Sequence, residues 1–166
     1  SVFGNPLVEG VYELGSIMKA LTIASGIDSG AITPQSTYVE HGKVVIDGKT
    51  ISNADPLDRG TVTMQDVLNL SLNTGAAHVV DVMGKEAFTK YMESFGFGEE
   101  TGIDLPNEIK GLVNNLHSKG NLEYANISFG QGIAVTPIGM ARALSALANG
   151  GYLVTPHLVT KMISSA

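Results

Sequence analysis

A serine and a lysine three residues apart, Ser16 and Lys19, open an apolar, helix-forming run near the start of the chain. On a helix, this spacing places both side chains on one face. A serine hydroxyl becomes a nucleophile when a nearby base takes its proton, and a lysine shielded from water can be that base. The same residues also fit a helix cap at Ser16 and a lysine that reaches solvent. The spacing alone leaves both interpretations open.

The composition indicates a globular domain rather than a nucleic-acid-binding chain, and no uninterrupted apolar run is long enough to span a membrane, since Arg142 interrupts the nearest candidate. Of 166 residues, 43% are hydrophobic and only 16% are charged, and the net charge is -6. The apolar fraction can fill a core, whereas an acidic chain lacks the clustered lysines and arginines that bind phosphate backbones. We therefore expect no nucleic-acid partner. Because the sequence opens on Ser1 rather than Met, we also expect residues 1–166 to be a piece of a longer protein.

The sequence predicts no metal and no cofactor. There is no cysteine, which excludes disulfides, thiol catalysis and thiolate metal sites. The segment Gly130-Gln131-Gly132 lacks the last glycine of a dinucleotide-binding loop, so we expect it to be a tight backbone segment. The histidines, which fall on different predicted elements without ligand spacing, are His41, His78, His117 and His157.

Hydrophobic periodicity and turn residues predict a mainly helical chain with one small β-hairpin. Side chains that can cap helices occur at Thr63, Asn73 and Thr136. We expect a helix from Ser16 to about Gly26, a hairpin within 37–51 that turns at Asp47-Gly48, helices over 64–71, 73–83, 85–95 and 137–149, and a loop over 96–126.

Five motifs occur in a fixed order along the chain. They are residues 12–19 (Tyr-Glu-Leu-Gly-Ser-Ile-Met-Lys), 71–76 (Ser-Leu-Asn-Thr-Gly-Ala), 95–98 (Phe-Gly-Phe-Gly), 101–106 (Thr-Gly-Ile-Asp-Leu-Pro) and 128–137 (Ser-Phe-Gly-Gln-Gly-Ile-Ala-Val-Thr-Pro). Together they resemble the transpeptidase domain of class B penicillin-binding proteins, from about Asn5 to the end. The resemblance implies that 1–166 is a partial transpeptidase domain, the mainly helical portion of the α+β D,D-transpeptidase/β-lactamase-like fold.

The resemblance implies an acyl-transfer enzyme of cell-wall synthesis that acts on D-Ala-D-Ala stem peptides of peptidoglycan and binds β-lactams. It matches Ser16 to the nucleophile and Lys19 to its base. Ser71 matches the hydroxyl that relays a proton to the leaving amine, and Asn73 matches the amide that orients the substrate. No cofactor is implied.

Two positions depart from the family pattern. Leu14 stands where the family usually has proline, which changes the entry to the nucleophile helix but removes no reacting group. The third family motif, K-T-G on a strand after S-x-N, does not occur: Lys49-Thr50 is followed by Ile51 and precedes Ser71. We therefore expect residues 1–166 alone to be inactive, because this motif supplies a cation for the substrate carboxylate and an oxyanion donor.

Two alternatives to a transpeptidase remain at this stage. A serine β-lactamase or D,D-carboxypeptidase shares S-x-x-K, and a non-catalytic penicillin-binding sensor or scaffold shares the fold. The resemblance also implies an extracytoplasmic position at the bacterial cytoplasmic membrane, an N-terminal anchor outside this chain, and work with the cell-wall synthesis machinery. We further expect self-association of the fragment, because Ile17, Leu21 and Ile23 are predicted to leave an apolar helix face uncovered.

Overall fold

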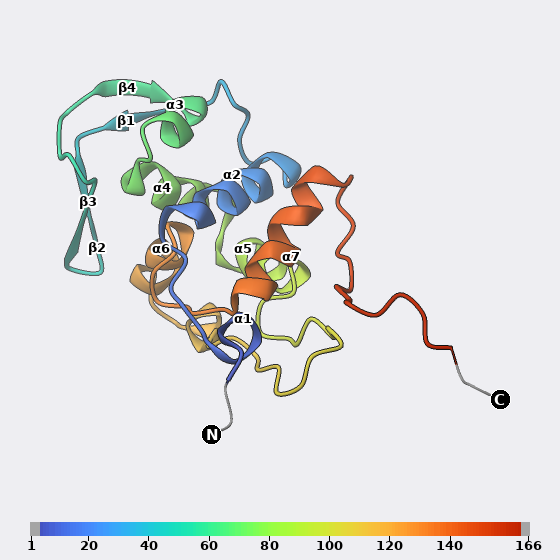
Figure 1. The fold of residues 1–166 in the computed structure, drawn as a ribbon. Coiled ribbons are helices and arrows are strands. Elements are labelled where there is room, and N and C mark those ends of the chain that lie inside the picture. Colours follow the sequence, from blue (N-terminus) through green and yellow to red (C-terminus); the bar gives the residue numbers. More distant parts are fainter. Residues whose placement is uncertain (1–3, 164–166) are drawn as a thin grey trace.

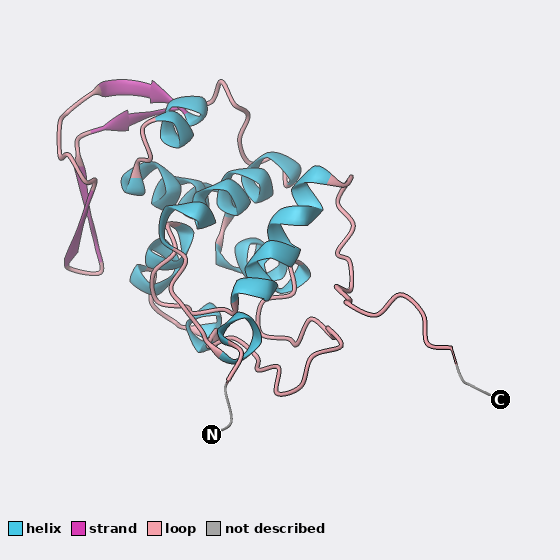
Figure 2. Ribbon diagram, in the orientation of Figure 1, coloured by secondary structure: helices cyan, strands magenta, loops and turns pink. Residues whose placement is uncertain are grey.

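The computed structural model describes residues 4–163, and the fold is mainly helical with two small antiparallel strand pairs (Figure 2). The α+β prediction is confirmed. In chain order the elements are α1 (Pro6–Glu9), the 3-10 helix η1 (Gly15–Ile17), α2 (Met18–Asp28), β1 (Thr37–Glu40), β2 (Lys43–Ile46), β3 (Lys49–Ser52), β4 (Gly60–Thr63), α3 (Met64–Asn69), α4 (Asn73–Met83), α5 (Lys85–Ser94), the 3-10 helix η2 (Asn114–His117), α6 (Leu122–Ser128) and α7 (Pro137–Ala148).

Helix α2 lies in the middle of the molecule and contacts α4, α5, α6 and α7 (Figure 1). Met18 and Leu21 are fully buried and pack with residues of those four helices, including Phe88 and Ile127. On the other side, Ile23 joins a second cluster with α3, α4 and β4. A helix that is apolar on nearly every face is stable only when it is surrounded, and α2 is surrounded.

The burial of α2 corrects one expectation. Leu21 and Ile23 are covered within the chain, whereas Ile17 is 53% exposed. The apolar face that was expected to drive self-association is therefore largely buried by α3, α4, α5 and α7. The prediction assumed that only residues outside 1–166 could cover this face. It is wrong for Leu21 and Ile23, which other helices of the same chain bury.

The sequence predicted that α2 ends at about Gly26, but the helix continues to Asp28. A Cβ at Gly26 would lie 2.7 Å from Val79 and 2.9 Å from Ile32, both of which are buried. The glycine therefore permits close packing of α4 against α2 rather than terminating the helix, because a side chain here would collide with its neighbours.

The predicted hairpin is formed by β2 and β3. Its turn residues, Asp47 and Gly48, both have positive φ values, 48° and 74°, as a two-residue type I′ turn requires. The sequence did not predict that β1 pairs with β4, with Tyr38 opposite Val62. These two strands are separated by the whole hairpin, so no local turn signal joins them.

The segment 96–126 was predicted to be loop. It contains η2 and most of α6, which runs from Leu122 to Ser128. The missing signal has a physical cause. The Asn121 side chain does not cap α6. Instead the carboxylate of Asp47, at the tip of the hairpin, accepts hydrogen bonds from the backbone N–H groups of Asn121 (2.6 Å) and Leu122 (3.0 Å). The cap is 74 residues away in sequence, beyond the reach of a local pattern.

The other predicted helices are present with small shifts at their ends. Thr63 and Asp66 form a reciprocal capping box at α3, and Thr136 caps α7, in which Pro137 is the first residue. Within residues 4–163, no helix is long and apolar enough to span a membrane.

Candidate active site

The hydroxyl of Ser16 and the amine of Lys19 face one another across one helical turn. Ser16 lies in η1, directly before α2, and Lys19 lies in the first turn of α2. Lys19 Nζ donates a hydrogen bond to Ser16 Oγ at 3.1 Å. The two residues differ in exposure: Ser16 is exposed, whereas Lys19 is only 2% exposed. A hydroxyl open to an incoming molecule is thus backed by a buried amine.

Ser71 completes a triangle of polar groups with these two residues. Its Oγ lies 2.9 Å from Lys19 Nζ and 3.0 Å from Ser16 Oγ, although Ser16 and Ser71 are 55 residues apart in sequence. Lys19 also donates to the Ser71 carbonyl oxygen at 2.7 Å. The structure therefore brings together three residues that the sequence placed in two separate motifs.

The backbone of Ser71 is bent into the left-handed region, with φ of 54°. This conformation costs a residue with a Cβ about 1–3 kcal/mol, so the surrounding structure must stabilise it. In the corner between α3 and α4 it turns both the carbonyl oxygen and the hydroxyl of Ser71 toward Lys19. Two of the three protons of the lysine amine are thus directed to one residue.

Burial lowers the pKa of Lys19 to about 8. Its three hydrogen-bond partners are neutral oxygen atoms, and none of the ion pairs formed within residues 4–163 involves it. A buried ammonium group without a counter-ion is destabilised relative to the neutral amine. At pH 7 about one molecule in ten therefore carries a neutral Lys19, against about one in 3,000 for an amine with a pKa of 10.5.

Asn73 is the first residue of α4 and does not cap that helix; the N-cap position is Leu72. The prediction of an Asn73 cap is therefore wrong. Its side-chain amide instead donates to the carbonyl oxygen of Ser52, at the end of β3, at 2.9 Å. Among the described residues no hydrogen bond links Asn73 to Ser16 or Lys19, and it is connected to them through the turn at Ser71.

The segment Gly130-Gln131-Gly132 packs directly against the turn that precedes Ser16. Gly15 N donates to Gly130 O at 3.0 Å, and a Cβ at Gly130 would lie 2.0 Å from Gly15 O. The Glu13 carboxylate also accepts a hydrogen bond from Gly132 N at 2.7 Å. The prediction of a tight backbone segment is confirmed, and its use is to support the Ser16 turn.

Sequence reasoning missed Glu13 and a second carboxylate, Glu40, which is buried behind Asn73. Glu13 lies in the first motif, three residues before Ser16, but its hydrogen-bond partner Gly132 is 119 residues away, so its role could not be read locally. Glu40 stands in none of the motifs, and no local signal pointed to it. No group of three or more His, Asp or Glu side chains in the described part of the chain is arranged to hold a metal ion.

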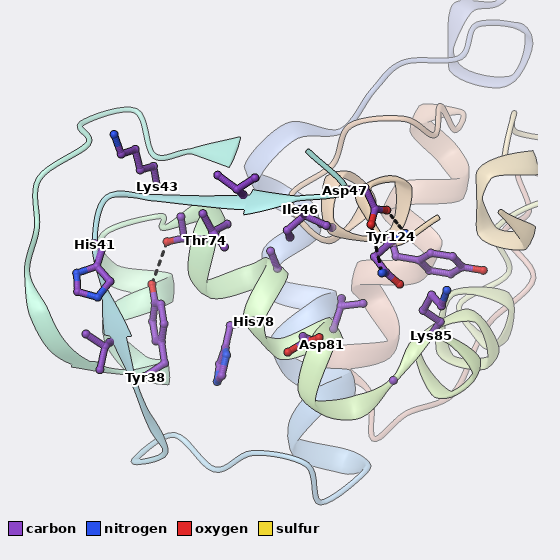
Figure 3. Close-up of a pocket in the computed structure, with 18 residues that line it drawn as sticks. Tyr38, His41, Lys43, Ile46, Asp47, Thr74, His78, Asp81, Lys85 and Tyr124 are labelled. Atoms are coloured by element: carbon purple, nitrogen blue, oxygen red, sulfur yellow. Dashed lines mark hydrogen bonds between the residues drawn. The ribbon is translucent and has the colours of Figure 1, made fainter. Parts of the chain in front are cut away.

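A cavity of about 670 Å³ lies behind α4, between this helix and the β2–β3 hairpin (Figure 3). Its described lining includes Tyr38, Thr74 and His78 but none of Ser16, Lys19, Ser71 and Asn73. The cavity is therefore separate from the polar triangle, which lies at an exposed surface.

This mainly helical α+β arrangement superposes on part of solved penicillin-binding transpeptidase structures. Residues 2–165 match the family model described as "Penicillin binding protein transpeptidase domain", and the chain belongs to that family. The resemblance inferred from the motifs is confirmed.

Relatives and solved structures agree with this membership. Stage V sporulation protein D of Bacillus subtilis is 35% identical over 98% of this chain and 26% of its own length. Peptidoglycan D,D-transpeptidase MrdA of Acinetobacter baumannii is 30% identical over 93% of this chain and 25% of its own. The structure of penicillin-binding protein 3 of Mycobacterium tuberculosis, complexed with aztreonam, superposes with a TM-score of 0.85 at 30% identity, over 95% of this chain and 35% of that chain. The chain spans about a quarter of the length of these curated relatives.

Proposed function

We propose that this chain supplies the nucleophile, its base and the proton relay of a peptidoglycan D,D-transpeptidase, which cross-links stem peptides through a serine acyl-enzyme. The observation that carries the proposal is the buried Lys19 amine, which is hydrogen-bonded to the hydroxyls of both Ser16 and Ser71. The MrdA relative is named a peptidoglycan D,D-transpeptidase, which supports the same reaction for this chain.

In the acylation step, neutral Lys19 accepts the proton of Ser16 as Ser16 Oγ attacks the carbonyl carbon of the penultimate D-Ala. The bond to the terminal D-Ala breaks, and its nitrogen receives a proton through the Ser71 hydroxyl, which touches both other groups. An ester on Ser16 remains. The backbone N–H of Ser16, at the start of a helix, is one donor for the developing oxyanion.

In the second step, an amine of a neighbouring stem peptide attacks this ester. The amine loses a proton to the Lys19 and Ser71 pair, the new amide bond forms, and Ser16 regains its hydroxyl. Asn73 orients the donor peptide: one of its amide protons is used by Ser52, which fixes the plane of the amide group beside the Ser71 turn. No step needs a metal or a cofactor.

The partners and location follow from the same assignment. We infer that β-lactams acylate Ser16 as substrate mimics, in line with the aztreonam complex of the relative from Mycobacterium tuberculosis. The substrate places the reaction outside the cytoplasmic membrane, where we expect a membrane anchor and contacts with other cell-wall synthesis proteins to hold the whole protein. A β-lactamase, a carboxypeptidase and a non-catalytic sensor are supported less, because the curated relatives carry transpeptidase and penicillin-binding names.

The experiment that tests the proposal is labelling of the full-length protein with a fluorescent penicillin, followed by mass spectrometry. We expect one penicillin mass on the peptide that contains Ser16, and its loss in Ser16→Ala. Ser94→Ala, a change at an exposed serine at the end of α5, is the matched control and should retain the label. Lys19→Arg should react at least about 100-fold more slowly, because arginine does not lose its proton. Label on another residue, or none on the full-length wild type, would refute the assignment.

A further inference from the structure

Glu40, at the end of β1, is a carboxylate with no exposed surface, and the reaction proposed above does not use it. Its hydrogen-bond partners are four uncharged donors: the hydroxyls of Tyr38 and Thr74, the backbone N–H of Gly42, and the side-chain amide of Asn53 at 2.9 Å. Burial raises the pKa of Glu40, but the hydrogen bonds from Thr74, Tyr38, Gly42 and Asn53 outweigh burial and hold the pKa below its usual value. The group is an anion that gathers donors from three separate segments.

Two of these donor residues directly follow, in sequence, the two residues of the Asn73–Ser52 hydrogen bond. Thr74 follows Asn73, and Asn53 follows Ser52, whose carbonyl accepts the Asn73 amide. Asn53 also binds Thr74 directly, because its Oδ1 accepts from Thr74 N at 3.2 Å. The Glu40 carboxylate therefore joins the end of β3 to the first turn of α4 one residue behind the Ser52–Asn73 contact.

Apolar packing also joins these two elements, because Ile51 of β3 clusters with Ala76 of α4. Leu72 provides no side-chain cap, and the face of the helix that carries Thr74 and His78 borders the cavity rather than a packed core (Figure 3). Tyr38, which stacks on His78 with ring centroids 5.1 Å apart, is itself tied to Glu40 through its hydroxyl. The polar network thus holds the cavity side of the helix, beside the apolar contact between α4 and β3.

We propose that Glu40 is a positioning residue that fixes the Ser71–Asn73 turn relative to β3, acting through Thr74 and Asn53. A carboxylate can accept bonds from all four donors at once, whereas an amide of the same shape would present its own N–H protons to some of them. Loss of the charge should therefore let the start of α4 shift, which moves Ser71 relative to Lys19 and Asn73 relative to the substrate. This inference rests on the proposed function.

The test compares Glu40→Gln and Thr74→Val with two matched variants in the full-length protein. Within residues 4–163, Glu108 is a half-buried carboxylate that shares no hydrogen bond with the candidate site residues: it accepts from the backbone N–H groups of Thr101 (2.8 Å) and Gly102 (2.9 Å) and from the Thr101 hydroxyl. Glu108→Gln therefore controls for the loss of a hydrogen-bonded carboxylate. Thr74→Ser keeps the hydroxyl that binds Glu40 and controls for the smaller change in shape.

The rate of acylation by a fluorescent penicillin is measured well below the thermal midpoint of each variant, where all are folded. We expect Glu40→Gln and Thr74→Val to react about 10- to 100-fold more slowly than wild type, and Thr74→Ser and Glu108→Gln to stay within about threefold. A loss that persists in fully folded protein and is rescued by serine separates positioning from mere stability.

If Glu40→Gln and Thr74→Val have lowered thermal midpoints but react at the wild-type rate, Glu40 only stabilises the fold and the inference is wrong. If Glu40→Gln does not fold, Thr74→Val decides by the same criterion. An unreactive wild type would instead refute the proposed function, and amide hydrogen exchange would then test the role of Glu40 alone. We expect faster exchange at Asn73 and Thr74 in Thr74→Val than in wild type. Unchanged exchange at these two residues would overturn the inference.

Discussion

Lys19 Nζ lies 2.7 Å from the carbonyl oxygen of Ser71, 52 residues further along the chain. This contact joins the first turn of α2 to the corner between α3 and α4, and it depends on the left-handed backbone of Ser71. Because the carbonyl oxygen is neutral, it binds the lysine amine without supplying the negative charge that would keep the lysine protonated. The geometry thereby fixes the amine in place and leaves its pKa low.

The lowered pKa of Lys19 predicts how reactivity depends on pH. In the full-length protein, the rate of acylation by penicillin should rise with pH and level off with an apparent pKa near 8, since only the neutral amine accepts a proton. Stopped-flow labelling between pH 6 and 10 measures this profile, because this range extends about two pH units on either side of the expected pKa. A rate that does not change across this range would contradict the role of Lys19 as base.

The lowered pKa of Lys19 also predicts how the free energy of unfolding depends on pH. The pKa of Lys19 is about 8 in the folded chain and near 10.5 in the unfolded chain, so between these values the unfolded state binds more protons. The contribution of Lys19 to the free energy of unfolding should therefore increase with pH from about 8 to 10.5. Below pH 8 the cost of the buried charge is fully present. Lys19→Met should remove this dependence in denaturant titrations.

Gly130→Ala should destabilise the protein and slow acylation. The added Cβ would lie 2.0 Å from Gly15 O, and Gly130 has a φ of 88°, which disfavours any side chain. The matched control is Gly151→Ala, because Gly151 has a φ of 90° and nothing within 4 Å of the added Cβ. Both substitutions carry backbone strain of about 1–3 kcal/mol, but only the first displaces the Ser16 turn. Equal effects of the two on the acylation rate would show that the Gly15–Gly130 contact does not support the site.

Asp47→Asn should lower the thermal midpoint, because the hairpin tip would lose the anion that caps α6. Backbone hydrogen bonds from Asn121 and Leu122 lower the pKa of Asp47. Its stabilising contribution is therefore present above the unfolded pKa and is lost as the pH falls through the lower folded pKa. We expect the variant to lose less stability on acidification to about pH 3 than the wild type. Asp81→Asn, at an exposed carboxylate of α4, is the control for a simple change in net charge.

Residues 1–166 alone should react with penicillin at least about 100-fold more slowly than a full-length protein that supplies a K-T-G strand. Loss of a single oxyanion donor costs about 100- to 1,000-fold, and the carboxylate-binding cation of that motif is missing as well. Intact-mass time courses of both proteins at equal penicillin concentration measure the ratio. Rapid stoichiometric labelling of the isolated chain at Ser16 would show that the motif is dispensable here.

Local sequence was sufficient wherever the deciding contact lies within a few residues. The spacing of Ser16 and Lys19 predicts their shared helix face, Thr63 with Asp66 predicts the start of α3, and Asp47-Gly48 predicts the hairpin turn, because each depends on backbone geometry over one turn. The four candidate residues were matched to roles only through resemblance to a family, since nothing in their separation in sequence brings Ser71 to Ser16.

Tertiary structure decided what depends on distant partners. The cap of α6 comes from Asp47, Gly26 serves the packing of Val79 rather than a helix end, and β1 finds β4 across the hairpin. The same holds for Glu40, an ordinary surface residue type that becomes a buried anion only when folding gathers Thr74 and Asn53 around it. Sequence specifies local conformation through short-range sterics and hydrogen bonds, whereas burial, and with it the pKa of Lys19, exists only once separate segments have excluded water together.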